Sequence, residues 1–209
     1  NTSSKLYCGF NNCIRVYELE RPGRQHKVIP TFRRANRETT GQRGIISCID
    51  FNPDKSGLYA TGSYSRNIGL FNSATGKLLY NLQGHRGGVT QVRWGADGNY
   101  LFSGGRKDDE ILCWDVRNTG DILVSIPRKV LTNQRVQFDI DHSGRFLVTP
   151  SQGSSVILYD LCSEGVQPVF ETSLPCQMVN GCALHPHQPY LAVSSGGRRF
   201  DLPATLMDE

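Results

Sequence analysis

A short alternating strand pattern recurs along this chain at a nearly constant interval, and no other feature restricts its fold more strongly. The pattern ends at Phe51, Trp94, Ile140 and Leu184, which are 43, 46 and 44 residues apart. A fixed period of this length indicates that one supersecondary unit is repeated along the chain. Because strands this short are not stable alone, each unit must bury its apolar faces against the next one.

Each repeat has the same internal order of strands and turns. The first strand runs into a turn signal such as Asp97-Gly98 or Ser143-Gly144, and a second strand of small and apolar residues follows. The third strand ends on an aromatic residue, at Phe71, Trp114 and Tyr159. Helical periodicity does not persist beyond a turn anywhere. The sequence therefore predicts an all-β, WD40-type β-propeller built from four-stranded antiparallel blades.

The repeat boundaries predict a partial propeller with three complete blades. One WD-repeat region is expected over residues 1–200, followed by a tail over 201–209. The expected blades are a partial one at 1–43, complete ones at 44–86, 87–132 and 133–178, and a partial one at 179–200. Incomplete blades leave unpaired strand edges. We therefore expect the sequence to be a fragment of a larger ring, which aggregates or needs a partner when isolated.

The composition argues against several classes of protein. No stretch approaches the roughly 20 consecutive apolar residues that span a bilayer, and the first residues show no secretory signal, so no membrane partner is expected. The seven cysteines lack paired CxxC spacing and are interpreted as reduced core thiols of an intracellular protein. A zinc site would have to combine Cys8 and Cys13 with His185 and His187 at no recognised spacing, so we expect no metal and no cofactor.

His85 and the acidic run Asp108, Asp109 and Glu110 are the residues that most resemble an enzyme site. His85 follows a glycine, and no nucleophile partner is fixed by the sequence, so a structural hydrogen bond is favoured over general-base chemistry. The acidic run resembles a metal cluster, but a tight-turn Asp beside two solvated acids is the simpler interpretation. We therefore predict that the protein is not an enzyme.

The segment from Gly84-His85 to Trp114-Asp115 resembles the general WD repeat, in which a GH pair is followed by a WD pair. This resemblance implies a buried hydrogen-bond chain formed by His85, Ser103, Asp108 and Trp114. The neighbouring blades depart from the pattern, because Ser65 and Gly153 stand where the Asp is expected. We expect those blades to be held rigid by packing alone.

More specific strings occur in register with the blades, at residues 44–49, 62–66, 102–108, 112–115 and 132–135. Together they resemble the telomerase Cajal body proteins, which are WD-repeat proteins of small Cajal-body ribonucleoproteins, and the resemblance runs from about Phe10 to Phe200. It implies a non-enzymatic scaffold that recognises CAB-box loops of small Cajal-body RNAs and telomerase RNA. It also implies that the scaffold directs the ribonucleoprotein to Cajal bodies and telomeres within the nucleus. The implied partners are H/ACA ribonucleoprotein proteins such as dyskerin, other Cajal-body proteins, and the cytosolic chaperonin for folding.

The charges are sorted between the two faces that such a meander presents. Loops that join second to third strands, or one blade to the next, emerge on one face and carry a net charge of +9, against +1 for the opposite face. Eleven of the thirteen basic residues on the first face are Arg, which suits phosphate contacts and stacking on unpaired bases. The candidate RNA-binding residues are Tyr64, Arg66, Arg86, Arg106, Lys107, Arg128, Lys129, Arg135, Arg198 and Arg199.

Two further points complete this prediction. Phe200 lies beside the basic set and is a second candidate for stacking a base, whereas the polar stretch from Arg33 to Arg43 is expected to order only on binding. The alternative that charge alone leaves open is a protein-interaction propeller that docks an acidic partner without direct RNA contact.

Overall fold

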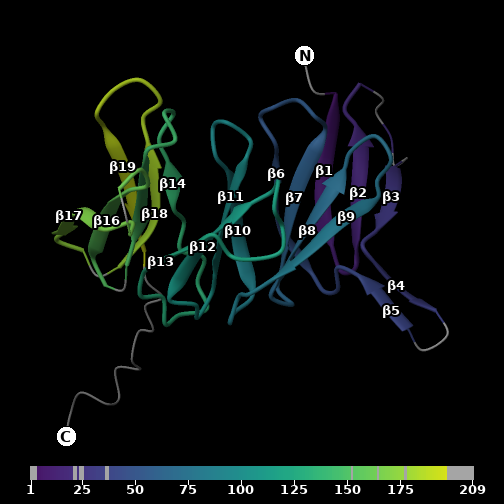
Figure 1. Ribbon diagram of the computed structural model, residues 1–209, viewed down its shortest axis with the longest axis horizontal. Coiled ribbons are helices and arrows are strands. Elements are labelled where there is room, and N and C mark those ends of the chain that lie inside the picture. Colours follow the sequence, from purple (N-terminus) through teal and green to yellow (C-terminus); the bar gives the residue numbers. More distant parts are fainter. Residues whose placement is uncertain are drawn as a thin grey trace, which may run out of the picture.

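The chain folds into an arc of antiparallel sheets. The computed structural model describes residues 4–20, 23, 26–35, 38–151, 153–163, 165–176 and 178–196, which form strands, turns and irregular segments and no helix. Neighbouring strands in each sheet are also neighbours in the sequence, so the sheets are meanders without crossovers. Figure 1 shows the sheets following one another from β1 to β19, with no closed ring. This confirms the predicted all-β, partial WD40-type propeller.

Three of the sheets are complete four-stranded blades. The first contains β6 (Ile46–Phe51), β7 (Leu58–Ser63), β8 (Asn67–Asn72) and β9 (Leu78–Gln83). The second contains β10 (Val89–Trp94), β11 (Tyr100–Gly105), β12 (Glu110–Asp115) and β13 (Val124–Pro127). The third contains β14 (Asp139–Ile140), β15 (Phe146–Pro150), β16 (Ser155–Asp160) and β17 (Pro168–Ser173).

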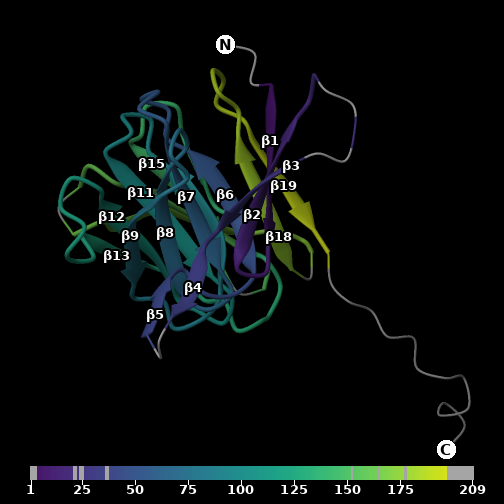
Figure 2. The same ribbon diagram turned by 90° about the vertical axis from the view of Figure 1, so that its right-hand side faces the viewer.

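The arc ends in two smaller sheets. One contains β1 (Lys5–Phe10), β2 (Cys13–Glu18) and β3 (His26–Pro30), and the other contains β18 (Val179–Leu184) and β19 (Leu191–Ser195). Viewed from the β1 end, Figure 2 shows β18 and β19 on the same side of the molecule as β1 to β3, so the row of sheets curves. Within the described residues, β1 and β19 each pair on one side only.

The polar stretch after β3 forms a two-stranded ribbon, which corrects one expectation. β4 (Phe32–Ala35) pairs with β5 (Glu38–Gly41) in an antiparallel register that includes Arg33↔Thr40. The base of the ribbon is fixed by backbone hydrogen bonds, such as the one from Gln42 N to Thr31 O at 2.7 Å. The expectation that this stretch orders only on binding is therefore wrong for its described part, which projects from the end of the arc in Figure 1.

The core consists of four apolar layers, one between each pair of neighbouring sheets. The layer between the first two complete blades contains Leu70, Trp94 and Trp114, all nearly inaccessible to solvent. Similar layers lie between β1–β3 and the first complete blade, between the second and third complete blades, and between the third complete blade and β18–β19. Because successive strand residues point to opposite faces, one blade supplies apolar side chains to two layers. Each fully buried large apolar side chain contributes about 1.5 to 3 kcal/mol to stability.

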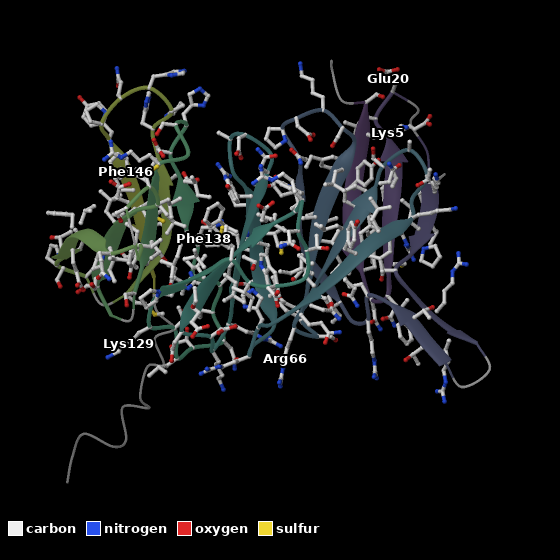
Figure 3. All side chains as sticks on the ribbon, in the orientation of Figure 1. Lys5, Glu20, Arg66, Lys129, Phe138 and Phe146 are labelled. Carbon is white, nitrogen blue, oxygen red and sulfur yellow. The ribbon has the colours of Figure 1, made fainter. Side chains whose placement is uncertain are left out.

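The two sets of loops lie on opposite faces of the arc. Figure 3 shows Arg66 and Lys129 at one edge of the sheets, and Lys5 and Glu20 at the other. Arg66 belongs to the β7–β8 turn, and Lys129 belongs to the connection from β13 to β14. The strand order therefore places the turns between second and third strands and the connections between blades on one surface.

Candidate nucleic-acid interface

Nine basic side chains reach the surface on the face that carries Arg66 and Lys129, which we call the basic face. They are Arg33, Arg34, Arg43, Arg66, Arg86, Arg106, Lys107, Lys129 and Arg135. Among described side chains from the same loops, the exposed or partly exposed acids are Asp109 and Glu110. Because Asp108 is buried and bonded, its charge is withdrawn from this surface. The basic face is therefore strongly cationic.

Two basic residues on this face have the left-handed backbone conformation that usually favours glycine. Arg66 in the β7–β8 turn has a φ of 69°, and Lys107 in the β11–β12 turn has a φ of 48°. Hydrogen bonds hold both turns, from Arg66 N to Ser63 O at 3.1 Å and from Lys107 N to Thr132 O at 3.1 Å. A non-glycine residue in this region costs about 1 kcal/mol or more, and such strain occurs preferentially at functional sites.

Tyr64 and Arg106 join two neighbouring blades on the basic face. The Arg106 guanidinium carbon lies 4.4 Å from the centroid of the Tyr64 ring. Tyr64 remains 40% exposed, so its ring is accessible to a ligand. Gly88 permits this contact, because a Cβ at that position would lie 2.9 Å from the Tyr64 carbonyl oxygen. An aromatic ring beside a guanidinium plane is a suitable surface for stacking an unpaired base.

The predicted RNA-binding residues do not all lie on this surface. Arg128 is only 3% exposed, and its guanidinium donates to Val136 O at 3.1 Å and Gly105 O at 3.3 Å. Burial lowers the pKa of Arg128 to about 10. The prediction that Arg128 contacts RNA is therefore wrong, because the side chain is buried and ties the β13–β14 connection to the end of β11. Arg198 and Arg199 lie outside the described residues, as do Arg37 and Phe200.

A buried polar residue enters each complete blade at the same position. Gln42, His85 and Arg128 are each 43 residues apart, and each contacts the hydroxyl of the fourth residue of the second strand. Gln42 Oε1 accepts from Thr61 Oγ1 at 2.5 Å, and Arg128 Nη1 lies 3.5 Å from Thr149 Oγ1. The expectation that the flanking blades are held by packing alone is wrong, because Gln42 and Arg128 replace the histidine.

In the middle blade the position is occupied by His85. Its Nδ1 lies 2.7 Å from Asp108 Oδ2, and its Nε2 lies 2.8 Å from Ser103 Oγ, which accepts a hydrogen bond from Trp114 Nε1 at 2.8 Å. Burial by itself would raise the pKa of Asp108, but hydrogen bonds from His85 and from backbone N–H groups outweigh it and lower that pKa.

The order Asp108, His85 and Ser103 resembles the triad of a serine hydrolase. However, Ser103 has no exposed surface, and its Oγ is already bonded to the Trp114 indole. A substrate cannot approach a nucleophile in that position, so this network stabilises the blade. Within the described parts of the chain, no group of three or more His, Cys, Asp or Glu residues is arranged to hold a metal ion. In the acidic run, the Asp109 carboxylate instead accepts a hydrogen bond from Val130 N at 3.1 Å.

The sequence prediction counted Arg43 among the thirteen basic residues of this face but missed Gln42 as a part of the region. Gln42 is completely buried and links the ribbon to β7 through its hydrogen bond from Nε2 to Thr61 O at 2.9 Å. The signal that could have revealed it is the spacing of 43 residues to His85 together with the preceding Gly41. Arg43 is exposed on the basic face, beside these buried contacts.

No helix in the described ranges has the length and apolar character needed to cross a membrane. Comparison with known proteins places the fold in a family. The model of the WD domain, G-beta repeat, matches residues 34–72 and 76–115. Telomerase Cajal body protein 1 from Bos taurus is 46% identical over 99% of this chain, and the protein of that name from Homo sapiens is 45% identical over 99%.

A more distant relative extends this similarity. The telomerase Cajal body protein 1 homolog from Drosophila melanogaster is 36% identical over 94% of this chain. The aligned regions make up 38%, 37% and 35% of the bovine, human and fly proteins, so the chain spans less than two fifths of the length of these curated relatives.

Proposed function

Because this chain belongs to the WD-repeat proteins and is homologous along 99% of its length to telomerase Cajal body protein 1, we propose that it is an RNA-binding scaffold of Cajal-body and telomerase ribonucleoproteins. In this proposal the basic face binds CAB-box-type loops of small Cajal-body RNAs and of telomerase RNA. The scaffold directs these particles to Cajal bodies and telomeres in the nucleus. It performs no catalysis itself.

The observation that carries the proposal is the asymmetry of charge between the two faces. The basic face presents nine basic side chains, whereas Lys27, Lys55, Lys77, Arg117 and Arg145 on the opposite face are balanced by Glu20, Asp54, Asp97, Asp121 and Asp141. Neutralising phosphates with Arg and Lys supplies most of the sequence-independent affinity for RNA. A rigid, cationic surface with an accessible Tyr64–Arg106 pair therefore suits a single-stranded loop whose bases are splayed out.

The proposed partners are of two kinds. The RNAs would occupy the basic face, and the opposite face would remain free for H/ACA ribonucleoprotein proteins such as dyskerin and for other Cajal-body proteins. The cytosolic chaperonin is proposed to assist folding, because each blade exposes apolar faces and strand edges until the neighbouring blade has formed.

Replacing Arg66 and Arg106 together by Ala tests the site. We expect weaker binding of a CAB-box loop RNA, and a slope of log K against log salt that is smaller in magnitude by about 1.4, because two phosphate contacts to a single strand are lost. The melting temperature should fall by no more than about 4 °C, since Arg66 is exposed and Arg106 loses only its partly exposed contact with the Tyr64 ring. Arg117→Ala on the opposite face is the matched control and should change neither the RNA affinity nor its salt slope. Unchanged affinity in the double variant would remove the site assignment.

Crosslinking followed by RNA sequencing tests the identity of the ligand. The expected result is enrichment of loop motifs from H/ACA-type RNAs, with fewer crosslinks in the Arg66→Ala and Arg106→Ala variant. Recovery of RNA without that enrichment would contradict the proposal. If no RNA is crosslinked at all, the basic face is assigned to the docking of an acidic protein, as the alternative interpretation of its charge predicts.

A further inference from the structure

A cationic groove runs along the outer flank of the arc, between the three-stranded end sheet and the first complete blade. It has a volume of about 530 Å³ and is formed by residues of β3, the β4–β5 ribbon and the β8–β9 turn. Its lining contains Lys27, Arg33 and Lys77, the exposed threonines Thr40 and Thr75, the buried Thr31, and no acidic residue. We call this the flank groove. Apart from Arg33, which belongs to the basic face, none of its residues is assigned to the RNA site.

The walls of the flank groove are fixed by contacts on both sides. The β8–β9 turn packs on β3, since Gly76 lies so close to Ile29 that a Cβ added to the glycine would be 3.4 Å from the Ile29 side chain. Asn81 Nδ2 donates to Gly41 O at 3.2 Å and ties β9 to the end of the ribbon. At the base of the ribbon, Thr31 Oγ1 donates to Gln42 O at 2.9 Å. The groove is therefore part of the folded framework.

The flank groove continues from the basic face. Arg33 belongs to the ribbon on the basic side, whereas Lys27 and Lys77 lie near the loops of the opposite side, as the β2–β3 pairing of Val16 with Lys27 requires. In Figure 1 the ribbon leaves the arc next to β3 and β9. A polyanion on the basic face can thus pass Arg33 and enter the groove without crossing an acidic lining residue.

We propose that the flank groove holds the phosphate backbone of the single-stranded RNA that flanks the loop bound on the basic face. This inference rests on the proposed function. Phosphates are the expected ligand because three cations and two exposed hydroxyl residues line the groove and no carboxylate does. A groove of about 530 Å³ suits a single strand whose backbone follows it.

The test uses the full-length protein and two RNAs. One RNA contains only the loop, and the other carries a single-stranded extension of about eight nucleotides, within the range that one binding groove accommodates. The variant replaces Lys27 and Lys77 together by Ala, and Lys55→Ala is the matched control on an exposed loop outside the groove. Affinity is measured by fluorescence anisotropy over a series of salt concentrations.

We expect the wild-type protein and Lys55→Ala to bind the extended RNA more tightly than the loop. In the double variant, affinity for the extended RNA should fall about fivefold to tenfold at about 100 mM salt, and its salt slope should decrease by about 1.4. Affinity for the loop RNA should not change. This pattern would support the assignment of the flank groove.

Three outcomes would overturn the inference, and they differ from one another. If the double variant binds the extended RNA as the wild type does while both bind the loop, the groove is wrong and the proposed function stands. If the wild type binds neither RNA, the proposed function fails and the inference fails with it. If the double variant loses binding of a polyglutamate peptide but not of RNA, the groove belongs to an acidic polypeptide.

Discussion

Gln42, His85 and Arg128 solve one structural problem with three different side chains. Each lies on the segment that precedes the first strand of a complete blade, and each points at least one N–H group into that blade. Each is less than 10% exposed. Small residues provide the room, since a Cβ at Gly104 would lie 2.5 Å from Arg128 Nη2. The shared requirement is a buried polar partner for the hydroxyl of the second strand, because an unsatisfied buried polar group costs about 1 to 3 kcal/mol.

Arg128→Ala tests this role at the residue scale. The substitution removes the donors to Val136 O and Gly105 O, so we expect a loss of about 3 kcal/mol in the free energy of unfolding. RNA affinity of the folded fraction should not change. Lys129→Ala, next in sequence but exposed, should alter stability by less than about 0.5 kcal/mol. Denaturant titration measures both. Weaker RNA binding at unchanged stability would return Arg128 to the interface.

The Asp108 carboxylate makes the stability of the middle blade depend on pH. Its pKa is lower in the folded chain than its ordinary value, so the ionised form is favoured by folding. The resulting stabilisation is present above the unfolded pKa of about 3.9 and is lost as the pH falls through the lower folded value. We expect the melting temperature to decrease below about pH 4.

Asp108→Asn isolates this contribution. At neutral pH the variant should be less stable by about 2 kcal/mol, because a charge-assisted bond to His85 is replaced by a neutral one. Its melting temperature should depend less on acid than that of the wild type. Asp121→Asn, an exposed control on the opposite face, should follow the wild-type curve. Identical acid profiles for Asp108→Asn and wild type would contradict the argument.

At the scale of elements, the strands of the complete blades could be predicted because their information is local. Alternating apolar residues and turn signals specify β7, β8, β11 and β12 without reference to the rest of the chain. Two elements could not be predicted in this way. The ribbon β4–β5 depends on an anchor at Gln42, and the strand expected to end at Ile140 is reduced to the two residues of β14.

The reduction of β14 has a specific cause in the neighbouring blade. Gln91 of β10 donates from Nε2 to Phe138 O at 2.8 Å and accepts from Phe138 N at 3.0 Å. Its side chain therefore satisfies both backbone groups that would otherwise pair with a strand. Gln137 N donates to Asn180 O at 2.8 Å, in the next sheet. A glutamine 47 residues away in sequence cannot be identified as a strand partner from pattern alone.

Gln91→Leu tests the link between the blades. The leucine preserves most of the volume but leaves Phe138 N and O without this partner, so we expect a loss of about 2 to 3 kcal/mol. Hydrogen exchange of the Phe138 amide should accelerate by more than about tenfold. Gln83→Leu at an exposed position of β9 should change stability by less than about 0.5 kcal/mol. Protection of the Phe138 amide in Gln91→Leu would contradict this role.

At the scale of the whole molecule, the polarity of charge could be predicted because it follows from strand order. Once the meander is recognised, alternate loops must emerge on opposite faces, and Arg66, Arg106 and Lys107 are assigned to one of them. Which basic residues reach the solvent could not be predicted in the same way. Arg128 is held away from the solvent by hydrogen bonds to Val136 O and Gly105 O. The Tyr64–Arg106 pair depends on how two blades pack together.

The two ends of the arc differ from its interior in how well their apolar side chains are covered. The second strands of the complete blades, β7, β11 and β15, are almost entirely buried, whereas every residue of the equivalent β19 is exposed. Leu191 and Val193 of β19 are each 41% exposed, and Val28 of β3 is 51% exposed. Exposed apolar side chains on an unpaired strand favour association with another chain.

We therefore expect these 209 residues, prepared alone, to self-associate at micromolar concentration. Replacing Leu191 and Val193 together by Lys should reduce the associated fraction in sedimentation velocity, because charges on an edge strand oppose pairing. The far-ultraviolet circular dichroism spectrum should be retained. Leu123→Lys, at a 52% exposed position outside the terminal sheets, should not reduce association. A monodisperse wild-type monomer that melts cooperatively would contradict this prediction, because β19 would then need no cover.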